Sequence, residues 1–354
     1  MQTTVSAKKL FTGSRWIENC SLVIENNIIV SIEPEKNPFH EILAPAFIDL
    51  QVYGAGGKLF SVFPAVNSLQ LLHTACVNSG THYFLPTVAS NNIEVFRSCI
   101  DAVREYWKTG GKGCLGIHLE GPWLNPIKRG AHLEEFLHVP TFEEVASLIA
   151  EAKDVIKIIT LAPECCSTEI IKLLRENNII LSAGHSNATY AQAMQGFDAG
   201  ISLATHLFNA MSPLQHRKPG LVGAVLHHPT VMASIIPDGY HVDWVPLKLA
   251  QQLLGNRLFV ITDAVTDTNA GPYQHQLAGD KYEADGVLSG SALTMLKACN
   301  NLMQFASIEM SEAIRLCSYY PATAIGLGHK LGKLELGYTA SFVSLKETDG
   351  FLSI

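Results

Sequence analysis

The stretch IILSAGHSNATYAQAMQGFDAGISLATHLFNAM, residues 179–211, contains one complete strand–helix–strand unit. The apolar runs at 178–184 and 201–205 have the length of strands, and the segment between them has the length and amphipathic pattern of a helix. Each run ends at a histidine, His185 or His206. The unit predicts two parallel strands joined by a helix, with both histidines at the carboxyl edge of the sheet.

The same alternation extends over most of the chain from residue 45 onward. Strands are expected at 46–51, 82–87, 114–119, 156–162, 178–184, 201–205, 231–237 and 258–262. Helices are expected at 66–79, 92–108, 141–152, 167–176, 188–199, 245–254, 291–305 and 311–318. Eight strand–helix alternations predict an α/β fold of the TIM-like (β/α)₈ barrel type, because a closed barrel needs that number.

Both ends of the chain have a different pattern. Residues 9–33 show short β-branched runs separated by Gly and Asn, which indicate strands, and residues 35–43 look like a polar connector. A β-like pattern returns near the C-terminus. We therefore expect a small β-sandwich domain formed by residues 1–44 and 330–354, beside a barrel of residues 45–329.

Composition narrows the class of protein. Hydrophobic residues make up 47% of the chain, and 25 basic against 32 acidic residues give a net charge of −7. This balance argues against a nucleic-acid or anionic-membrane partner, since those are bound by clustered Lys and Arg. No apolar run reaches the roughly 18–20 residues of a membrane span. The eight cysteines are scattered without a CxxC motif, so free thiols in the cytoplasm are expected.

Polar side chains follow six of the apolar runs, where a barrel would have its active-site face. They are Gln51, Glu120, His185, His206, His241 and Asp263. Glu120 alone would equally suit a structural ion pair, and a single histidine would suit a buried core position. Glu120, His185 and His206 together form a three-ligand set with open coordination positions, which is typical of a catalytic divalent metal site.

Asp263, His132 and Arg217 each have both an ordinary and a functional interpretation. Asp263 suits a helix N-cap, but beside a metal it could move a proton to and from the attacking water. His132 suits a solvated loop, but near a metal it could donate a hydrogen bond to a substrate carbonyl. Arg217 suits an exposed surface, but its planar guanidinium also suits a phosphate.

Several motifs carry a resemblance to a known family. They are APAFIDLQVYGAGG (44–57), HLEGPWLNPIKRGAH (118–132), LAPE (161–164), GHSNATY (184–190), THLFNAMSPL (205–214), HRKPGLVG (216–223), DGYHV (238–242), TDAV (262–265) and LSGSALTM (288–295). In these motifs the chain resembles the N-acetylglucosamine-6-phosphate deacetylases of the amidohydrolase superfamily. The motifs run in order across most of the chain, and several are long enough to be specific.

The resemblance implies a metal-dependent amide hydrolase that converts N-acetyl-D-glucosamine 6-phosphate to D-glucosamine 6-phosphate and acetate. It implies one divalent ion per subunit, held by Glu120, His185 and His206, with Zn²⁺ expected first and Fe²⁺ also suitable. Water on the metal is then the nucleophile, Asp263 is the general base and acid, and His132 polarises the carbonyl.

The resemblance also implies substrate contacts and an assembly. The expected contacts with the phosphorylated amino sugar are Asn209, Ala210, Arg217, His241 and Leu288. Arg217 is expected on the phosphate, and in this family that arginine reaches across a subunit interface. A homodimer is therefore expected.

One departure from the superfamily pattern concerns the first strand. Many amidohydrolases have His-x-His there to hold a second metal, whereas this chain has Gln51-Val52-Tyr53. The departure favours a mononuclear site, with Gln51 near metal-bound water. Two alternative functions remain open, namely hydrolysis of another N-acetylated amino sugar and a catalytically inactive binding protein with the amidohydrolase fold.

Overall fold

The computed structural model describes residues 2–284 and 286–354. Its larger part is a parallel sheet of eight strands, hydrogen-bonded in chain order. These strands are β5 (Phe47–Val52), β8 (Thr81–Ala89), β9 (Ile117–Glu120), β10 (Ile156–Leu161), β11 (Ile180–Ala183), β12 (Leu203–Ala204), β13 (Met232–Ile235) and β14 (Leu258–Val260). The predicted barrel is confirmed, and each strand overlaps its predicted range.

The chain beyond β14 closes the barrel against β5. Val52 forms a parallel bridge with Ala264. The backbone N–H of Asp263 donates to Gln51 O at 3.0 Å, and that of Tyr53 donates to Ala264 O at 2.8 Å. Closure therefore places the end of the last strand beside the end of the first, which brings Gln51 and Asp263 together.

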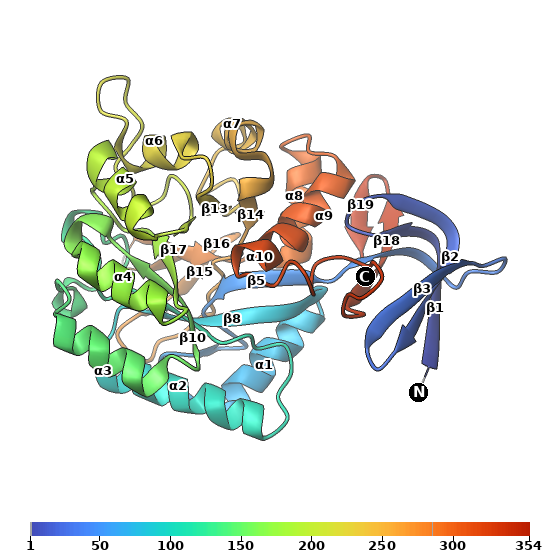
Figure 1. The fold of residues 1–354 in the computed structure, drawn as a ribbon, viewed down its shortest axis with the longest axis horizontal. Coiled ribbons are helices and arrows are strands. Elements are labelled where there is room, and N and C mark those ends of the chain that lie inside the picture. The colour runs from blue at the N-terminus through green and yellow to red at the C-terminus, as the bar shows by residue number, and fades with distance from the viewer. Residues whose placement is uncertain (1, 285) are drawn as a thin grey trace.

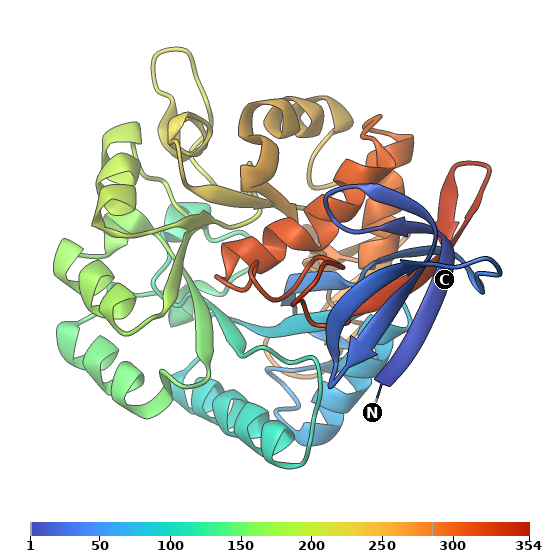
Figure 2. The same cartoon turned by 45° about the vertical axis from the view of Figure 1, so that its right-hand side comes forward.

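Helices surround the barrel on its outer face (Figure 1, Figure 2). They are α1 (Val66–Val77), α2 (Ile93–Lys108), α3 (Phe142–Ala152), α4 (Thr168–Glu176), α5 (Tyr190–Ala199), α6 (Gly220–His227), α7 (Trp244–Leu254), α8 (Met295–Gln304), α9 (Met310–Cys317) and α10 (Tyr319–Ala324). Polar N-caps explain why most starts were predictable. Thr141 and Thr189, for example, begin α3 and α5 with capping boxes.

Two helices, α6 and α10, fall outside the predicted set. Residues Gly220–Val225 of α6 are all buried, so the helix has no polar face to produce an amphipathic pattern. It also starts directly after Pro219, in a Pro-Gly pair that predicts a turn. The second helix, α10, has only six residues and is mostly buried, so the same signal is missing.

The two ends of the chain build a separate sheet beside the barrel, seen at the right of Figure 1. Its strands are β1 (Gln2–Phe11), β2 (Trp16–Glu25), β3 (Ile28–Pro34), β4 (His40–Pro45), β18 (Phe342–Thr348) and β19 (Phe351–Ser353). They form one continuous sheet in the order β19-β18-β4-β1-β2-β3, whereas a sandwich would have two sheets. The predicted connector at 35–43 was partly wrong, because β4 pairs with β1 and β18 and buries Ile42 and Leu43.

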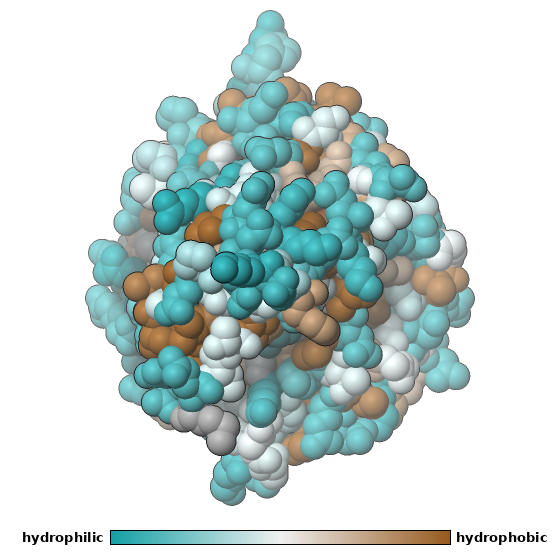
Figure 3. All heavy atoms as spheres, turned by 90° about the vertical axis from the view of Figure 1, so that its right-hand side faces the viewer, coloured by the Kyte–Doolittle hydropathy of each residue, from teal (hydrophilic) through white to brown (hydrophobic). Residues whose placement is uncertain are grey.

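The sheet of the two ends has its own small core. It consists of Ala7, Leu10, Cys20, Leu22, Ile24, Ile29, Leu43 and Leu334. Seen from this side of the molecule, hydrophilic residues cover most of the surface and the apolar ones form separate patches (Figure 3). Among the described residues, no helix combines the length and the apolar character of a membrane span.

A three-stranded antiparallel sheet follows β14, where the sequence predicts a long loop at 267–287. Its strands are β15 (Gln276–Ala278), β16 (Lys281–Ala284) and β17 (Val287–Ser291). Gly279 and Asp280 alone separate β15 from β16, and a Gly-Asp pair between short runs is a hairpin signal. The glycine-rich segment after β5 forms a second small hairpin from β6 (Gly54–Ala55) and β7 (Lys58–Leu59).

A buried carboxyl group ties the two ends of the barrel sheet together. Asp49 is 2% exposed and accepts hydrogen bonds from the Thr262 hydroxyl and from the backbone N–H groups of Thr262 and Gln51. Burial raises the pKa of Asp49 from 3.8 to about 6, although these hydrogen bonds oppose the rise. The native protein therefore binds a proton at the Asp49 carboxyl group more tightly than the unfolded chain does.

This difference predicts a pH-dependent stability for the wild type. The contribution of Asp49 is fully present below about pH 4 and is lost as the pH rises through 6. The shift of about two units corresponds to about 3 kcal/mol. Asp49→Asn should remove this pH dependence and still fold. The Nδ2 group of the new asparagine can donate to Thr262 Oγ1, and the Thr262 hydroxyl can then donate to Gln51 O, 3.3 Å away.

The measurement is the free energy of unfolding of both proteins at pH 4.5 and pH 7.5. The difference between the two proteins removes the contributions of the other titrating groups, which both share. If the free energy of unfolding changed equally with pH in both proteins, Asp49 would have an ordinary pKa in the native state.

Candidate metal centre and active site

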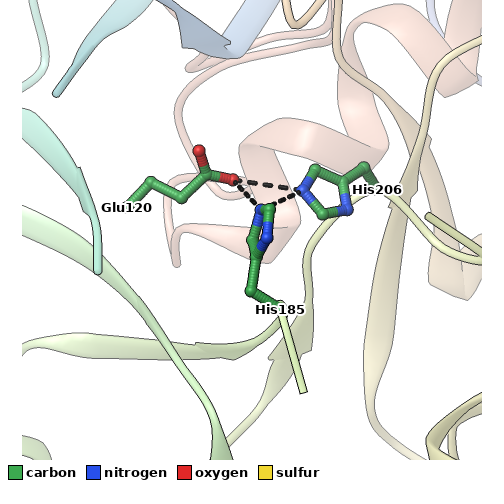
Figure 4. Close-up of side chains that lie close together, drawn as sticks. All are labelled: Glu120, His185 and His206. Atoms are coloured by element: carbon green, nitrogen blue, oxygen red, sulfur yellow. Dashed lines mark hydrogen bonds and ion pairs between the residues drawn. The ribbon is translucent and has the colours of Figure 1, made fainter. Parts of the chain in front are cut away.

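Three side chains converge at the carboxyl ends of the barrel strands. Glu120 is the last residue of β9, His185 follows β11 by two residues, and His206 follows β12 by two residues. The three side chains point toward one another from separate strands (Figure 4). Among the described residues, they are the one group of three or more His, Cys, Asp or Glu side chains whose ligand atoms converge.

The distances within this trio suit a metal ion. Glu120 Oε1 lies 3.1 Å from His206 Nε2 and 3.3 Å from His185 Nε2, and the two nitrogens lie 3.0 Å apart. Donor atoms about 2.0–2.1 Å from a tetrahedral ion are about 3.3 Å from each other. A cation between the three atoms also accounts for two imidazole nitrogens held so close together.

The other ring nitrogens are consistent with this use. His185 Nδ1 donates to Lys128 O at 3.0 Å, which leaves the lone pair of Nε2 free for a metal. His206 Nδ1 is buried and has no hydrogen-bond partner among the described residues. The backbone at His206 is fixed, since its N–H donates to Ser234 Oγ at 2.8 Å.

Glu120 is an ionised carboxylate in this environment. Burial alone would raise its pKa, but the hydrogen bond from His132, the charge and hydrogen bond of His185 and the hydrogen bond of His206 hold the pKa of Glu120 well below its ordinary value. A buried carboxylate surrounded by imidazoles is a ready ligand for a divalent cation.

Gln51 and Tyr53 occupy the place where a His-x-His pair would stand. Gln51 Nε2 lies 2.7 Å from Asp263 Oδ1 and 3.0 Å from Glu120 Oε1. The Tyr53 hydroxyl donates to Glu120 Oε2. Gln51 thus connects the two carboxyl groups of the site, and neither residue offers an imidazole to a second metal ion.

Asp263 lies beside this group with its backbone fixed on both sides. Its N–H donates to Gln51 O, and its carbonyl accepts from Ser291 N–H at 2.9 Å. Gly290 is required next to it, because its φ is +103° and a Cβ there would lie 2.9 Å from Asp263 O. Burial and the charge of Glu120 raise the pKa of Asp263 well above its ordinary value. A bound divalent cation would act in the opposite direction.

His132 turns a hydrogen-bond donor toward the centre. Ser90 N–H donates to His132 Nδ1 at 3.3 Å, so that nitrogen is an acceptor and the ring proton belongs on Nε2. Nε2 lies 3.2 Å from Glu120 Oε2. The side chain is 5% exposed, which rules out the solvated-loop interpretation.

Backbone strain is concentrated in this site. His185, His206, Ala210 and Asp263 all have positive φ, at 46°, 38°, 50° and 55°. Positive φ is uncommon in residues other than glycine, and such conformations often mark functional positions. The chain turns sharply at these strand ends, and the turn directs the side chains into the barrel mouth.

A cavity of about 200 Å³ opens directly over the trio. Of the predicted site residues, it is lined by Glu120, His132, His185, His206, Asn209, Ala210, His241, Asp263 and Leu288. His241 Nδ1 donates to Asp238 Oδ2 at 2.6 Å, which leaves Nε2 available to a ligand. Burial opposes ionisation of Asp238, but the bond from His241 lowers its pKa below the ordinary value.

Two predicted site residues are not part of the cavity lining, namely Gln51, which bonds to Glu120 and Asp263, and Arg217. Arg217 lies apart from the cavity. It is exposed in the loop before α6, where Gln215 and Lys218 pair through two backbone hydrogen bonds of 3.1 Å. This loop rises from the body of the molecule (Figure 1, Figure 2). No Lys or Arg of the described chain lines the cavity itself.

Sequence reasoning missed several other residues that line the cavity. They are Leu59, Ser61, Ala89, Gly130, Ala131, Val265, Tyr273, His275, Ser289 and Gly290, whereas Tyr53, which also lines it, was noted as a poor second metal ligand. Most of them belong to the segments that follow β5 and β14, and nothing in the sequence singled out Tyr273 or His275 within these segments. Burial lowers the pKa of His275 to about 4, so its ring is neutral near pH 7.

Comparisons with known proteins agree with this geometry. The model of the amidohydrolase family matches residues 42–351. The N-acetylglucosamine-6-phosphate deacetylase of Haemophilus influenzae is 34% identical over 352 residues, covering 94% of this chain and 92% of that protein. The N-acetylgalactosamine-6-phosphate deacetylase of Escherichia coli O157:H7 is 31% identical, covering 98% of this chain and 95% of that protein.

Two solved structures are similar over nearly the whole chain. The N-acetylglucosamine-6-phosphate deacetylase of Pasteurella multocida has a TM-score of 0.91 and 34% identity, and covers 99% of this chain and 96% of its own. A mutant of the Mycobacterium smegmatis enzyme, in complex with N-acetyl-D-glucosamine 6-phosphate, has a TM-score of 0.90 and 25% identity, with coverage of 99% and 96%.

Proposed function

Because the chain belongs to the amidohydrolase family, we propose that it hydrolyses the acetamide of N-acetyl-D-glucosamine 6-phosphate to D-glucosamine 6-phosphate and acetate. The observation that carries the proposal is the convergence of Glu120, His185 and His206 beside Asp263 in one cavity. A three-ligand metal site next to a carboxyl group is the arrangement that amide hydrolysis by activated water requires.

Glu120, His185 and His206 would hold one divalent ion, which would acidify a bound water molecule and polarise the acetamide carbonyl. Asp263 accepts the proton of the attacking water through its carboxylate. The same carboxyl group then donates that proton to the sugar amine, which is too basic to leave as an anion. Gln51, bonded to Asp263 Oδ1, keeps the group directed toward the centre.

His132 supports the carbonyl oxygen as charge develops on it. Its Nε2–H is the donor that faces the centre, and the bonds from Ser90 fix the ring in this tautomer. Donors directed at a developing oxyanion usually contribute the largest part of acyl-transfer catalysis. In the absence of substrate the same N–H is held by Glu120.

The first test concerns the metal. Carefully desalted protein should contain one divalent ion per chain, with Zn²⁺ expected first, as measured by elemental analysis. A chelator should abolish activity, and added metal should restore it. At free metal a thousandfold above Kd, the free energy of unfolding should rise by about 4 kcal/mol. A stoichiometry near two, with both ions required for activity, would contradict the role assigned to Gln51 and Tyr53.

The phosphate of the substrate needs a cation that the cavity itself does not supply. Arg217 is exposed on a projecting loop, so we propose that it binds the phosphate in the site of a second copy of the chain, within a homodimer. The eight free cysteines support the expected cytoplasmic setting, because thiols stay reduced there.

A second substrate is favoured by a specific observation, since two relatives at 31% and 32% identity are N-acetylgalactosamine-6-phosphate deacetylases. The deciding experiment measures acetate release from both phosphorylated sugars and from unphosphorylated N-acetylglucosamine, with and without chelator. We expect the highest kcat/KM with N-acetyl-D-glucosamine 6-phosphate. Activity that is higher on the galactosamine epimer would make that compound the substrate. Chelator-insensitive activity would exclude the metal mechanism.

A further inference from the structure

Five largely apolar side chains cluster on one side of the active-site cavity. Tyr53, Leu59, Ala89, Val265 and Tyr273 line it there, and we call these five residues the apolar wall. Four of them belong to a single buried cluster, and Ala89 packs against it. They come from the ends of β5 and β8 and from the segments that follow β5 and β14.

Polar lining is found on another part of the cavity, where Asn209 follows β12 beside Ala210. In a closed barrel of eight strands, with the order found here, β5 and β8 stand across from β11 and β12. Ala89, at the end of β8, therefore faces the side of the barrel mouth that carries Asn209.

The reacting centre lies between these two sides. Ala89 pairs in register with Glu120 on the neighbouring strand. The Tyr53 hydroxyl donates to Glu120, and the Tyr273 ring centroid lies 6.4 Å from that of His132. The apolar wall thus begins directly beside the groups that would hold and polarise the carbonyl.

An N-acyl amino sugar has a polar part and an apolar part, which match the polar and apolar parts of the cavity lining. A trans amide directs its two substituents to opposite sides, the sugar from the nitrogen and the alkyl group from the carbonyl carbon. Hydroxyl and phosphate groups lose free energy when buried without polar partners, whereas a methyl group gains by leaving water. We propose that the apolar wall is the acyl subsite and that Ala89 sets the size of the acyl group that is accepted. This inference rests on the proposed function.

Ala89 is the residue of the wall through which size can be tested. Leu59, Tyr53 and Val265 are buried, with exposed fractions of 2%, 8% and 8%, while Ala89 is half-buried and open to the cavity. Ala89 also has the smallest side chain of the five. A larger side chain there takes space from the cavity. It breaks no side-chain hydrogen bond, because an alanine side chain makes none.

The experiment compares Ala89→Val and Ala89→Gly with the wild type on three substrates, the N-formyl, N-acetyl and N-propionyl derivatives of glucosamine 6-phosphate. Ala89→Val should lower kcat/KM for the N-acetyl substrate at least about tenfold relative to the N-formyl substrate, which lacks the methyl group. Ala89→Gly should raise the N-propionyl to N-acetyl ratio by a similar factor. Metal content of each variant should remain unchanged.

Equal losses of Ala89→Val on the N-formyl and N-acetyl substrates would overturn the assignment, because a merely structural defect does not depend on the acyl group. If Ala89→Val fails to fold, Val265→Ala replaces it and is measured on the N-propionyl and N-acetyl substrates. An unchanged ratio of kcat/KM between these two substrates would overturn the proposal equally. Failure of the proposed function would appear differently, as absence of acetate release by the metal-loaded wild type.

Discussion

Asp263→Asn should bind metal and substrate like the wild type and yet lose turnover by about 10²–10⁴-fold, the range associated with general acid–base catalysis. Asparagine keeps the shape of the side chain and its acceptor oxygen, so Gln51 can still donate to it at the position of Oδ1. What it loses is the ability to take a proton from water and return it to the leaving amine. The loss should therefore appear in kcat rather than in KM.

Three measurements define this result, namely kcat and KM by acetate release, metal content by elemental analysis, and substrate affinity by calorimetry. Asp280→Asn is a matched control, because it makes the same change at an exposed carboxylate whose one ion pair within the described part of the chain is with Lys297. Near-normal turnover of Asp263→Asn with metal intact would refute the assignment. His132 would then be the next candidate for the base.

Much of this site was predictable because polar side chains interrupt buried apolar runs. Glu120, His185 and His206 each follow a run that ends a barrel strand, and a buried ligand group there is costly unless it has a partner. The barrel itself was predictable for the same reason, since its strands are apolar throughout and its helices are mostly amphipathic. The family resemblance supplied the roles of the individual residues.

The parts of the fold and of the site that were not predictable depend on contacts that a single sequence does not show. The buried helix α6 has no polar face, so its pattern could not distinguish it from a loop. Strand β4 was hidden by the polar residues before it and is stabilised by two distant partner strands, β1 and β18. Tyr273 and His275 lie between β14 and β15, and Tyr273 donates to Ser90 O, 183 positions away in the chain. The contact between Tyr53 and Glu120 joins residues 67 positions apart.

Arg217→Ala should weaken transition-state binding of the phosphorylated sugar by about 2–3 kcal/mol, roughly 30- to 150-fold in kcat/KM, if a charge-assisted fork to the phosphate is lost. Activity on unphosphorylated N-acetylglucosamine should hardly change. Lys218→Ala is the control, since it removes a neighbouring exposed cation of the same loop. Equal losses on both substrates would mean that Arg217 has a structural role.

A mixture of two defective variants tests whether Arg217 acts across the subunit interface. In a homodimer of either variant alone, Arg217→Ala or Asp263→Asn impairs both active sites. In a mixed dimer, the Arg217→Ala chain keeps its own Asp263 and receives Arg217 from the other chain, so one complete site forms. Co-expressed, differently tagged chains should therefore regain close to half of the wild-type activity in the doubly tagged fraction. If Arg217 served the cavity of its own chain, no complete site could form and activity would stay low. The exposed position of Arg217 on its projecting loop, and the absence of Lys and Arg among the described residues that line the cavity, lead us to expect recovery.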